Sequence, residues 1–327
     1  MLIKNNSKYN HINSTISIII PAYNVELYIT DSLDSIAKQT IPPDEIIIIN
    51  DGSTDRTSSI IKKHPLYARI KLIEVDNGGQ GLARNIGIAE ATSDYIYFFD
   101  SDDLLVSNFI ASIKQLIINN KYPDLLLFSG KSFNDSNYTN SNFNPNYIRP
   151  FEGIYTDQKT LLHDLMLYPE LSCSPCLYIS KRKLWNENKL RFNSFYHEDE
   201  EIFYPLIFSA SSYIVSKERF FLRRIRPNST MTKTKVEKHE LGQRAVLISL
   251  LDLLNKNKFS KLKSYLIRRR LNTFIFSYLY TSQQVSNNPN YKLILKSTIK
   301  SQGIKTPLRL LKMMTANRLK KFIYKHD

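Results

Sequence analysis

Short apolar strands that alternate with helical segments constrain the fold of this chain more than any other feature of its sequence. Each apolar run is rich in β-branched or aromatic side chains and is followed by a turn-forming or acidic residue. The runs are Ile16–Ile20, Ile46–Ile49, Ile70–Val75, Tyr95–Phe99 and Asp124–Phe128. Because the runs are apolar on both faces and helical patterns separate them, we predict an α/β fold with a doubly wound, mostly parallel sheet.

Positive charge is concentrated in the last part of the chain. The formal net charge is +15, and residues 233–327 hold 21 Lys and Arg against 4 Asp and Glu. Apolar residues beyond Lys235 recur at helical spacing, as at Leu247, Leu250, Leu251 and Leu254. We therefore expect three parts: a polar tail over residues 1–15, an α/β domain over 16–232, and a basic, mainly helical C-terminal region over 233–327.

The basic region has three explanations that its residues alone leave open. It is a solvated helix face, a surface attracted to anionic membrane lipids, or a surface for nucleic acid. Nucleic acid is the weakest of the three, because no recognition-helix or RNA-binding signature accompanies the aromatic residues of this region.

Several features favour an intracellular location. No apolar run approaches the roughly 18 residues that span a bilayer. The first 15 residues are polar, with no apolar core of a signal peptide. The 2 cysteines cannot build a disulfide scaffold. We expect a cytoplasmic protein, with peripheral binding to the inner face of the plasma membrane as an open alternative.

Acidic and turn-forming residues follow three of the predicted strands directly. They are Asn50-Asp51-Gly52, Asp76 to Gly79 (DNGG) and Asp100 to Asp103 (DSDD). The carboxyl ends of parallel strands lie at one edge of a sheet, and ligands of such sheets bind at that edge. The sequence therefore predicts that these three motifs, although about 25 residues apart, share one ligand site.

The Asp100-Ser101-Asp102 motif is a candidate metal site. Two carboxylates at positions i and i+2, just past a strand, can turn toward one cation, and hard oxygen ligands suit Mg²⁺ or Mn²⁺. The alternative is a solvated turn in which Asp103 caps the next helix, which we expect over Leu104–Ile118.

Other motifs also have a functional and a structural interpretation. Asp51 can accept a hydrogen bond from a pyrimidine ring and Tyr23 can stack on a base, but both also suit an ordinary turn. The acidic run His197 to Glu201 offers a carboxylate general base, although acidic residues are common at a helix N-terminus.

Arg223, Arg224 and Arg226 predict a flexible basic loop that closes over a pyrophosphate, or else a basic surface loop. Cys173 and Cys176 form a lone CxxC pair. No further ligands stand at the usual spacing of a zinc site, so we expect two free thiols.

Taken in order, the motifs resemble those of the family 2 glycosyltransferases, which have the GT-A nucleotide-sugar fold. The resemblance runs from Ile16 to about Ser229. It rests on Ile18 to Asn24 (IIIPAYN), Ser35-Ile36 with Gln39-Thr40, Asp51 to Asp55 (DGSTD), Asn77 to Gly87 (NGGQGLARNIG), Asp100 to Asp103, and Leu190-Arg191-Phe192 ahead of His197 to Glu200.

The resemblance implies a role for each matching residue that binds the donor. Tyr23 and Asp51 would hold the uracil of a UDP-sugar, with Arg84 nearby, and Asp100 would contact the ribose. Asp102, with Asp100, would ligate Mn²⁺ or Mg²⁺. Pro21 and Ser101 stand in the same motifs and are counted with the residues that bind the donor.

Further along the chain, Asp199, or failing that Glu198, would be the catalytic base. Arg224, Arg226 and Ser229 resemble a loop that covers the diphosphate. Two positions depart from the family pattern: Asn50 stands where a first Asp is usual, and Cys176 stands where many relatives have Lys.

The resemblance implies an inverting, metal-dependent transferase that moves a sugar to a hydroxyl of a glycan or a lipid-linked acceptor. Surface polysaccharide biosynthesis, of the capsule, lipopolysaccharide or teichoic-acid-like type, is the expected setting. Two other classes stay open. A nucleotidyltransferase would normally carry a Gly-rich loop with Lys or Arg after the first strand, which Pro21-Ala22-Tyr23-Asn24 is not. A non-catalytic protein would use the basic region to bind nucleic acid or an anionic surface.

Overall fold

The computed structural model describes residues 14–135, 138, 145–168, 172–227, 229, 237–256, 258–286 and 289–302. Most of the predicted N-terminal tail therefore lies outside the described residues. The chain divides into two compact units. Unit 1 comprises Met1–Leu161, Glu170–Ser194 and Pro205–Thr232, and unit 2 comprises Leu162–Pro169, Phe195–Tyr204 and Lys233–Asp327.

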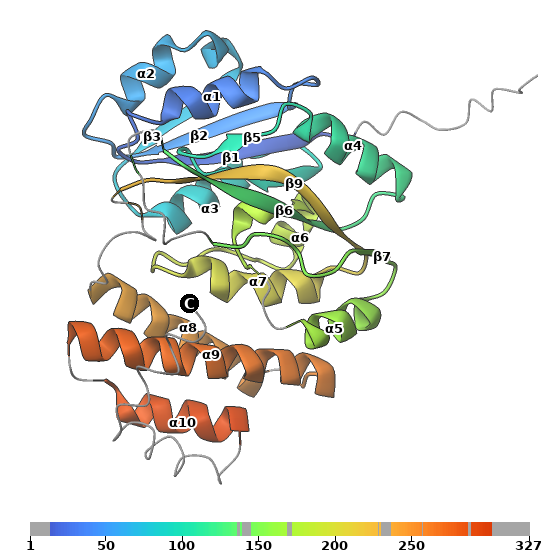
Figure 1. Cartoon of the computed structure of the whole chain (residues 1–327), viewed down its shortest axis with the longest axis vertical. Helices are drawn as coiled ribbons and strands as arrows, with labels where there is room; N and C mark the ends of the chain where they lie inside the picture. The colour runs from blue at the N-terminus through green and yellow to red at the C-terminus, as the bar shows by residue number, and fades with distance from the viewer. Residues whose placement is uncertain are drawn as a thin grey trace, which may run out of the picture. The chain divides into compact units, whose positions relative to one another are not determined.

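Unit 1 is built on one mixed sheet (Figure 1). Its strands occur in the order β3-β2-β1-β4-β8-β6-β9-β5, and β7 pairs with β9. The strands are β1 (Ile16–Ala22), β2 (Glu45–Asp51), β3 (Ile70–Val75), β4 (Tyr95–Phe98), β5 (Leu104–Leu105), β6 (Leu125–Asn134), β7 (Gly153–Tyr155), β8 (Tyr178–Lys181) and β9 (Tyr213–Ile225). Neighbours among β1 to β4 are parallel, as predicted, whereas β8 is antiparallel to both β4 and β6.

Helices of unit 1 cover both faces of this sheet (Figure 1). They are α1 (Ile29–Ala37), α2 (Thr57–Lys63), α3 (Gln80–Glu90), α4 (Phe109–Asn119) and α6 (Arg182–Glu187), with 3-10 turns η1 (Pro65–Arg69) and η2 (Pro175–Leu177). The boundary between the two units falls within helices α5 (Gln158–Leu167) and α7 (Glu198–Ser209). Alternate residues of β1 meet the two helical layers. Ile18 and Ile20 join the core cluster that includes Leu33 of α1 and Ile113 of α4. On the other face, Ile19 packs so close to Gly87 of α3 that a side chain at position 87 would clash with it.

The expected strands and most of the expected helices are present, but three segments differ from prediction. Residues Leu104–Leu105 form strand β5 rather than the start of a helix, and α4 begins only at Phe109. Strand β6 continues to Asn134, six residues beyond the predicted run Asp124–Phe128. Strand β9 was not expected at all. Its centre is exposed and polar, so it lacks the continuous apolar run of a buried strand.

Unit 2 contains the three helices α8 (Glu237–Lys256), α9 (Lys261–Val285) and α10 (Tyr291–Gln302), which confirms the predicted helical character of residues 237–302. Leu247 and Leu250 of α8 are buried, as the spacing predicts. Within this unit, the guanidinium of Arg269 donates hydrogen bonds to the carbonyls of Leu165 and Met166, each at 2.7 Å. None of the described helices combines the length and the apolar character that crossing a membrane requires.

Candidate active site at the sheet edge

The carboxyl ends of β1, β2, β3 and β4 lie along one edge of the sheet, because these four strands are parallel neighbours. Pro21 is buried within β1, and Tyr23 follows this strand with 49% of its surface exposed. Asp51 ends β2, and Asp100 lies just beyond the end of β4. The fold therefore brings the predicted motifs to a common edge.

Asp51 holds the turn that follows β3. Its two carboxylate oxygens accept hydrogen bonds from the backbone N–H groups of Gly78 and Gly79, at 2.8 and 2.9 Å. The side-chain amide of Asn77 donates to the Asp51 carbonyl at 2.9 Å. Asp51 is buried, so these contacts fix the Asn77-Gly78-Gly79 turn that leads into α3.

At this edge the buried Arg84 forms an ion pair with the partly buried Asp100. Arg84 Nη2 donates to Asp100 Oδ1 at 3.0 Å, and the side-chain amide of Gln80 donates to the same oxygen at 2.9 Å. The Arg84 guanidinium lies over the ring of Phe192, 5.3 Å from its centroid. Burial by itself would raise the pKa of Asp100, but the charges of Arg84 and Arg223 lower it below its usual value. Asp100 is therefore ionised at neutral pH.

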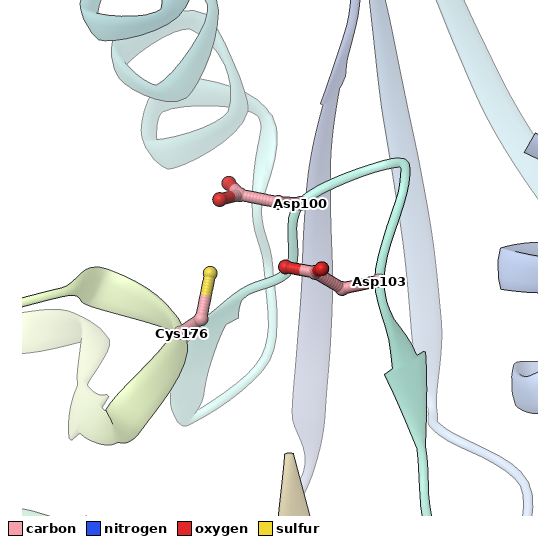
Figure 2. A group of neighbouring side chains, drawn as sticks. All are labelled: Asp100, Asp103 and Cys176. Atoms are coloured by element: carbon pink, nitrogen blue, oxygen red, sulfur yellow. The ribbon is translucent and has the colours of Figure 1, made fainter. Parts of the chain in front are cut away.

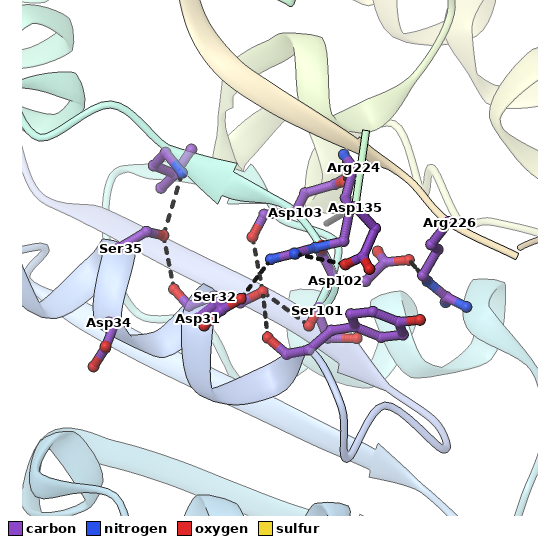
Figure 3. Close-up of polar contacts among 12 residues, drawn as sticks. Asp31, Ser32, Asp34, Ser35, Ser101, Asp102, Asp103, Asp135, Arg224 and Arg226 are labelled. Atoms are coloured by element: carbon purple, nitrogen blue, oxygen red, sulfur yellow. Dashed lines mark hydrogen bonds and ion pairs between the residues drawn. The ribbon is translucent and has the colours of Figure 1, made fainter. Parts of the chain in front are cut away.

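Asp102 is paired with a second arginine. Its Oδ2 accepts a hydrogen bond from Arg226 Nε at 2.6 Å, and the Arg226 guanidinium lies 4.7 Å from the centroid of the Tyr28 ring. Figure 3 shows Arg226 reaching toward Asp102 from the end of β9. Asp102 thus pairs with a different arginine from Asp100, although only Ser101 separates the two aspartates.

Arg224 belongs to strand β9, so the prediction of a flexible loop is wrong for this residue. Its side chain is buried and donates to the Asp102 carbonyl at 2.8 Å, to Asp135 at 3.0 Å and to Asp31 at 2.9 Å (Figure 3). Strand pairing fixes the backbone of Arg224, and these three acceptors fix its guanidinium.

The rest of the predicted arginine loop lies in or beyond β9. Arg223 is also in β9, and Arg226 follows its last residue. Ser229 is half-buried, between neighbours that fall outside the described residues.

A third group of side chains was missed by sequence reasoning. Asp100, Asp103 and Cys176 place one ligand atom each within 4.8 Å of one another, and Figure 2 shows the three side chains converging. Asp103 does not cap a helix, as we had considered, because β5 follows it. Instead, its Oδ1 accepts from the backbone N–H of Arg224 at 2.7 Å. The acidic run after β4 was the available signal for Asp103, but nothing in the sequence linked it to Cys176.

Ser32 of α1 fixes the backbone between these aspartates. Its hydroxyl donates to the carbonyls of Ser101 and Asp103, at 2.9 and 2.7 Å, and the Ser101 side chain is buried. Cys173 and Cys176 are both buried and neither is part of a disulfide, as predicted.

The acidic motif opens helix α7. Glu198 and Asp199 belong to its first turn, within unit 2, and both are half-buried. Asp199 Oδ1 accepts from the backbone N–H of Glu200 at 3.0 Å, and the Glu200 carboxylate pairs with Arg270 of α9. A negative charge in this first turn also interacts favourably with the helix dipole.

The residues present fit a divalent cation such as Mn²⁺ or Mg²⁺. Asp100 and Asp102 supply carboxylate oxygens, the ligands that these hard cations prefer. Asp102 already attracts a positive group, the Arg226 guanidinium, to its side chain.

Comparisons with known proteins identify the family. The sequence model described as glycosyl transferase family 2 matches residues 17–171. Glycosyltransferase GlyA of Streptococcus pneumoniae is 36% identical over 126 residues, which is 38% of this chain and 18% of GlyA. Poly(ribitol-phosphate) beta-N-acetylglucosaminyltransferase TarS of Staphylococcus aureus is 29% identical over 188 residues, 56% of this chain and 30% of TarS. The chain thus spans less than a third of the length of these two relatives.

Solved structures show the same fold. The structure of S. aureus TarS 1–349 in complex with UDP has a TM-score of 0.64 at 21% identity, and covers 88% of this chain and 81% of that chain. The mannosyltransferase PcManGT from Pyrobaculum calidifontis, in complex with GDP-Man and Mn²⁺, has a TM-score of 0.56 at 15% identity, and covers 94% and 82%. The matched model places residues 17–171 in glycosyl transferase family 2, and the solved structures show that the chain has the GT-A fold.

Proposed function

We propose that the chain is an inverting glycosyltransferase that moves a sugar from a UDP-sugar to a hydroxyl of a glycan or lipid-linked acceptor, in surface polysaccharide biosynthesis. The observation that carries this proposal is the row of Asp51, Arg84, Asp100 and Asp102 along one sheet edge.

The relatives give further support. TarS is named as a transferase acting on poly(ribitol-phosphate) and has been solved with UDP-GlcNAc. A Bacillus spizizenii poly(ribitol-phosphate) beta-glucosyltransferase is 43% identical over 97 residues, 28% of this chain and 15% of that protein.

We assign the donor nucleotide to the part of this edge that lies beyond the ends of β1 and β2. Tyr23 is exposed beside the end of β1, so its ring is accessible to stack on the uracil, with Pro21 holding the strand behind it. Asp51 shapes the adjacent turn and offers a carboxylate to the base. Arg84 keeps Asp100 ionised and in place for the ribose hydroxyls, and the buried Ser101 fixes the following bend.

The cation is assigned to Asp102, with Asp100 as its second carboxylate ligand. When bound, Mn²⁺ or Mg²⁺ would offset the negative charge that develops on the departing UDP. Arg226 lies against Asp102 and would meet the diphosphate beside it, with Ser229 further along the same segment. Because its guanidinium donates to three protein groups, we assign Arg224 to positioning the Asp102 backbone.

The base is assigned to the first turn of α7. Asp199, or failing that Glu198, would take the proton from the acceptor hydroxyl, which then attacks the anomeric carbon from the face opposite UDP. A single displacement of this kind inverts the configuration. Glu200 is a weaker candidate, since its carboxylate pairs with Arg270.

A panel of nucleotide sugars with Mn²⁺, scored by slow UDP release and by thermal shift, tests the donor class. Asp102→Ala is expected to lose metal-dependent turnover while the protein stays folded. Glu218→Ala is the control, because Glu218 is an exposed carboxylate of strand β9 that belongs to none of the motifs at this edge. Equal turnover in both variants would remove the metal assignment.

The base has a separate test. Asp199→Asn is expected to keep the thermal shift with UDP and to lose sugar transfer, because the amide cannot accept the proton. Glu201→Gln changes a neighbouring acidic residue in the same way and serves as the control. Transfer that persists in the Asp199→Asn variant would move the role to Glu198.

We further propose that helix α10 lies on the anionic inner face of the plasma membrane, which would make the cytoplasmic enzyme peripheral. Tyr291, Leu295 and Ile299 are four residues apart, so they share one side of the helix, and all three are exposed. Lys292 and Lys296 are exposed next to this stripe. An apolar stripe with adjacent lysines is typical of helices that lie in a lipid interface. Nucleic acid has no comparable support.

Flotation with liposomes tests this surface. The wild-type chain is expected to float with vesicles that contain anionic lipid and to stay behind with neutral vesicles. Lys292→Glu combined with Lys296→Glu is expected to abolish flotation, whereas Lys131→Glu with Lys217→Glu, the same charge change on exposed strand residues, is expected to leave it intact. Identical recovery of all proteins with both vesicle types would remove the proposal.

A further inference from the structure

We propose that Asp100, Asp103 and Cys176 form a binding site for a thiophilic divalent cation of the zinc class. This site shares Asp100 with the Mn²⁺ or Mg²⁺ site assigned to Asp102, but its other ligands, Asp103 and the Cys176 sulfur, suit a softer cation. It does not depend on the proposed transferase function, since the claim concerns binding of the metal alone.

The geometry of the three side chains suits such an ion. One carboxylate oxygen of each aspartate and the Cys176 sulfur all lie within 4.8 Å of one another (Figure 2). Zinc binds sulfur at about 2.3 Å and carboxylate oxygen at about 2.0–2.2 Å, so ligand atoms around it stand roughly 3–4 Å apart. Small side-chain movements would therefore close the site, with water as a fourth ligand.

An unsatisfied buried oxygen gives an independent reason to expect a ligand there. Asp103 is 1% exposed, and its Oδ2 has no hydrogen-bond partner among the described residues. Its other oxygen is occupied by the backbone N–H of Arg224. Burying a carboxylate oxygen without a partner is costly, and a bound cation would remove that cost.

The topology explains how Cys176 reaches aspartates more than 70 residues away in sequence. Strand β8 is antiparallel to β4, so η2, which precedes β8, lies at the same end of the sheet as Asp100. Tyr97 Oη donates to the Cys176 carbonyl at 3.1 Å. The Arg149 guanidinium donates to the carbonyls of Ser172 and Leu177, each at 2.8 Å, and holds both sides of this segment.

Charge and access are also consistent with a cation. The carboxylates of Asp100 and Asp103 both lie beside the Cys176 sulfur, and the Arg84 guanidinium pairs with Asp100. The cation would replace the thiol proton, which passes to the buffer. Entry is open on one side, because the Asp100 side chain is 17% exposed.

Binding of Cd²⁺, a spectroscopic substitute for zinc, tests the proposal in the absence of nucleotide. Cd²⁺ added to the reduced full-length protein is expected to produce the ultraviolet cadmium–thiolate absorption with a stoichiometry of about one, and Zn²⁺ is expected to displace it. Cys176→Ser should abolish the absorption. Asp103→Asn should weaken binding by at least about tenfold, the scale on which a metal site responds to loss of a supporting carboxylate.

Cys173→Ser is the matched control, because Cys173 is also a buried cysteine outside any disulfide but does not belong to the cluster. It should keep the full absorption and affinity. The chain has a single tryptophan, the buried Trp185, and its fluorescence shows whether each variant is folded. The proposal is overturned if folded wild-type protein gives no cadmium–thiolate absorption, or if folded Cys176→Ser gives the same absorption as the wild type.

Discussion

Replacing Arg149 with methionine tests how much this buried side chain stabilises unit 1, where it binds the carbonyls of the segment from Ser172 to Leu177. Arg149 is 1% exposed, yet within the described part of the chain none of its hydrogen-bond acceptors is a carboxylate. Its guanidinium donates instead to the carbonyls of Phe128, Ser172 and Leu177, at 2.8–2.9 Å. The register of β6 against β9 shifts between residues 127 and 129, which turns the Phe128 carbonyl out of the regular ladder and toward Arg149.

The magnitude follows from two opposing effects. A buried acceptor left without a partner costs about 1–3 kcal/mol, so three carbonyls would cost about 3–9 kcal/mol. Removing the guanidinium also removes the cost of burying its charge. Burial lowers the pKa of Arg149 to about 10, well below its ordinary value, a shift that corresponds to about 3 kcal/mol. We therefore expect Arg149→Met to lower the free energy of unfolding by about 3 kcal/mol.

Urea unfolding followed by Trp185 fluorescence measures this loss within unit 1. Trp185 is buried, stacks on Phe192 and donates to the Ser180 hydroxyl at 2.8 Å, so its emission changes when this unit opens. Arg191→Met is the control. Arg191 also donates to two carbonyls but is exposed, and its replacement should cost under about 1 kcal/mol. Equal unfolding midpoints for the two variants would refute the reasoning, since burial would then make no difference.

Two further perturbations concern unit 1. Burial would raise the pKa of Asp124, but hydrogen bonds from the side chain and backbone of Ser211, followed by those from Lys181, lower it, so this carboxylate stabilises the fold above about pH 4 and loses that contribution as the pH falls further. The unfolding free energy of Asp124→Asn should therefore fall less steeply than that of the wild type between about pH 5 and 3, as measured by urea titrations at each pH. Gly81→Ala would press a methyl group onto the carbonyl of Asn193 and should cost about 1–3 kcal/mol, whereas an unchanged melting temperature would contradict this packing.

The parallel half of the sheet could be predicted from sequence because its signal is local. A run such as Ile46–Ile49 is buried on both faces, and its composition alone distinguishes it from a helix face or a loop. Strand β9 could not be predicted in this way. Its buried ends are separated by an exposed polar stretch, and it is a strand because it pairs with segments far earlier in the chain, namely β5, β7 and above all β6, some 90 residues before it.

The same distinction holds for the candidate site. The sequence placed Asp51, Asp100 and Asp102 after strands that share an edge, because strand ends can be read locally. It could not show which groups pair with them. Arg226 is 124 residues from Asp102, and Cys176 reaches Asp100 only through the antiparallel insertion of β8. Partners of this kind are set by topology.

The composition of unit 2 bears on how the basic C-terminal region relates to catalysis. The unit takes in two short stretches from the middle of the chain, and one of them opens helix α7 with Glu198 and Asp199. Arg270 of α9 pairs with Glu200 in that turn, and Arg269 caps the carbonyl end of α5. Deleting everything after residue 232 would therefore not release a minimal enzyme. The deletion would remove Arg270, whose contact with Glu200 supports the turn that carries the proposed base. Residues after 232 are therefore needed to hold that turn in place.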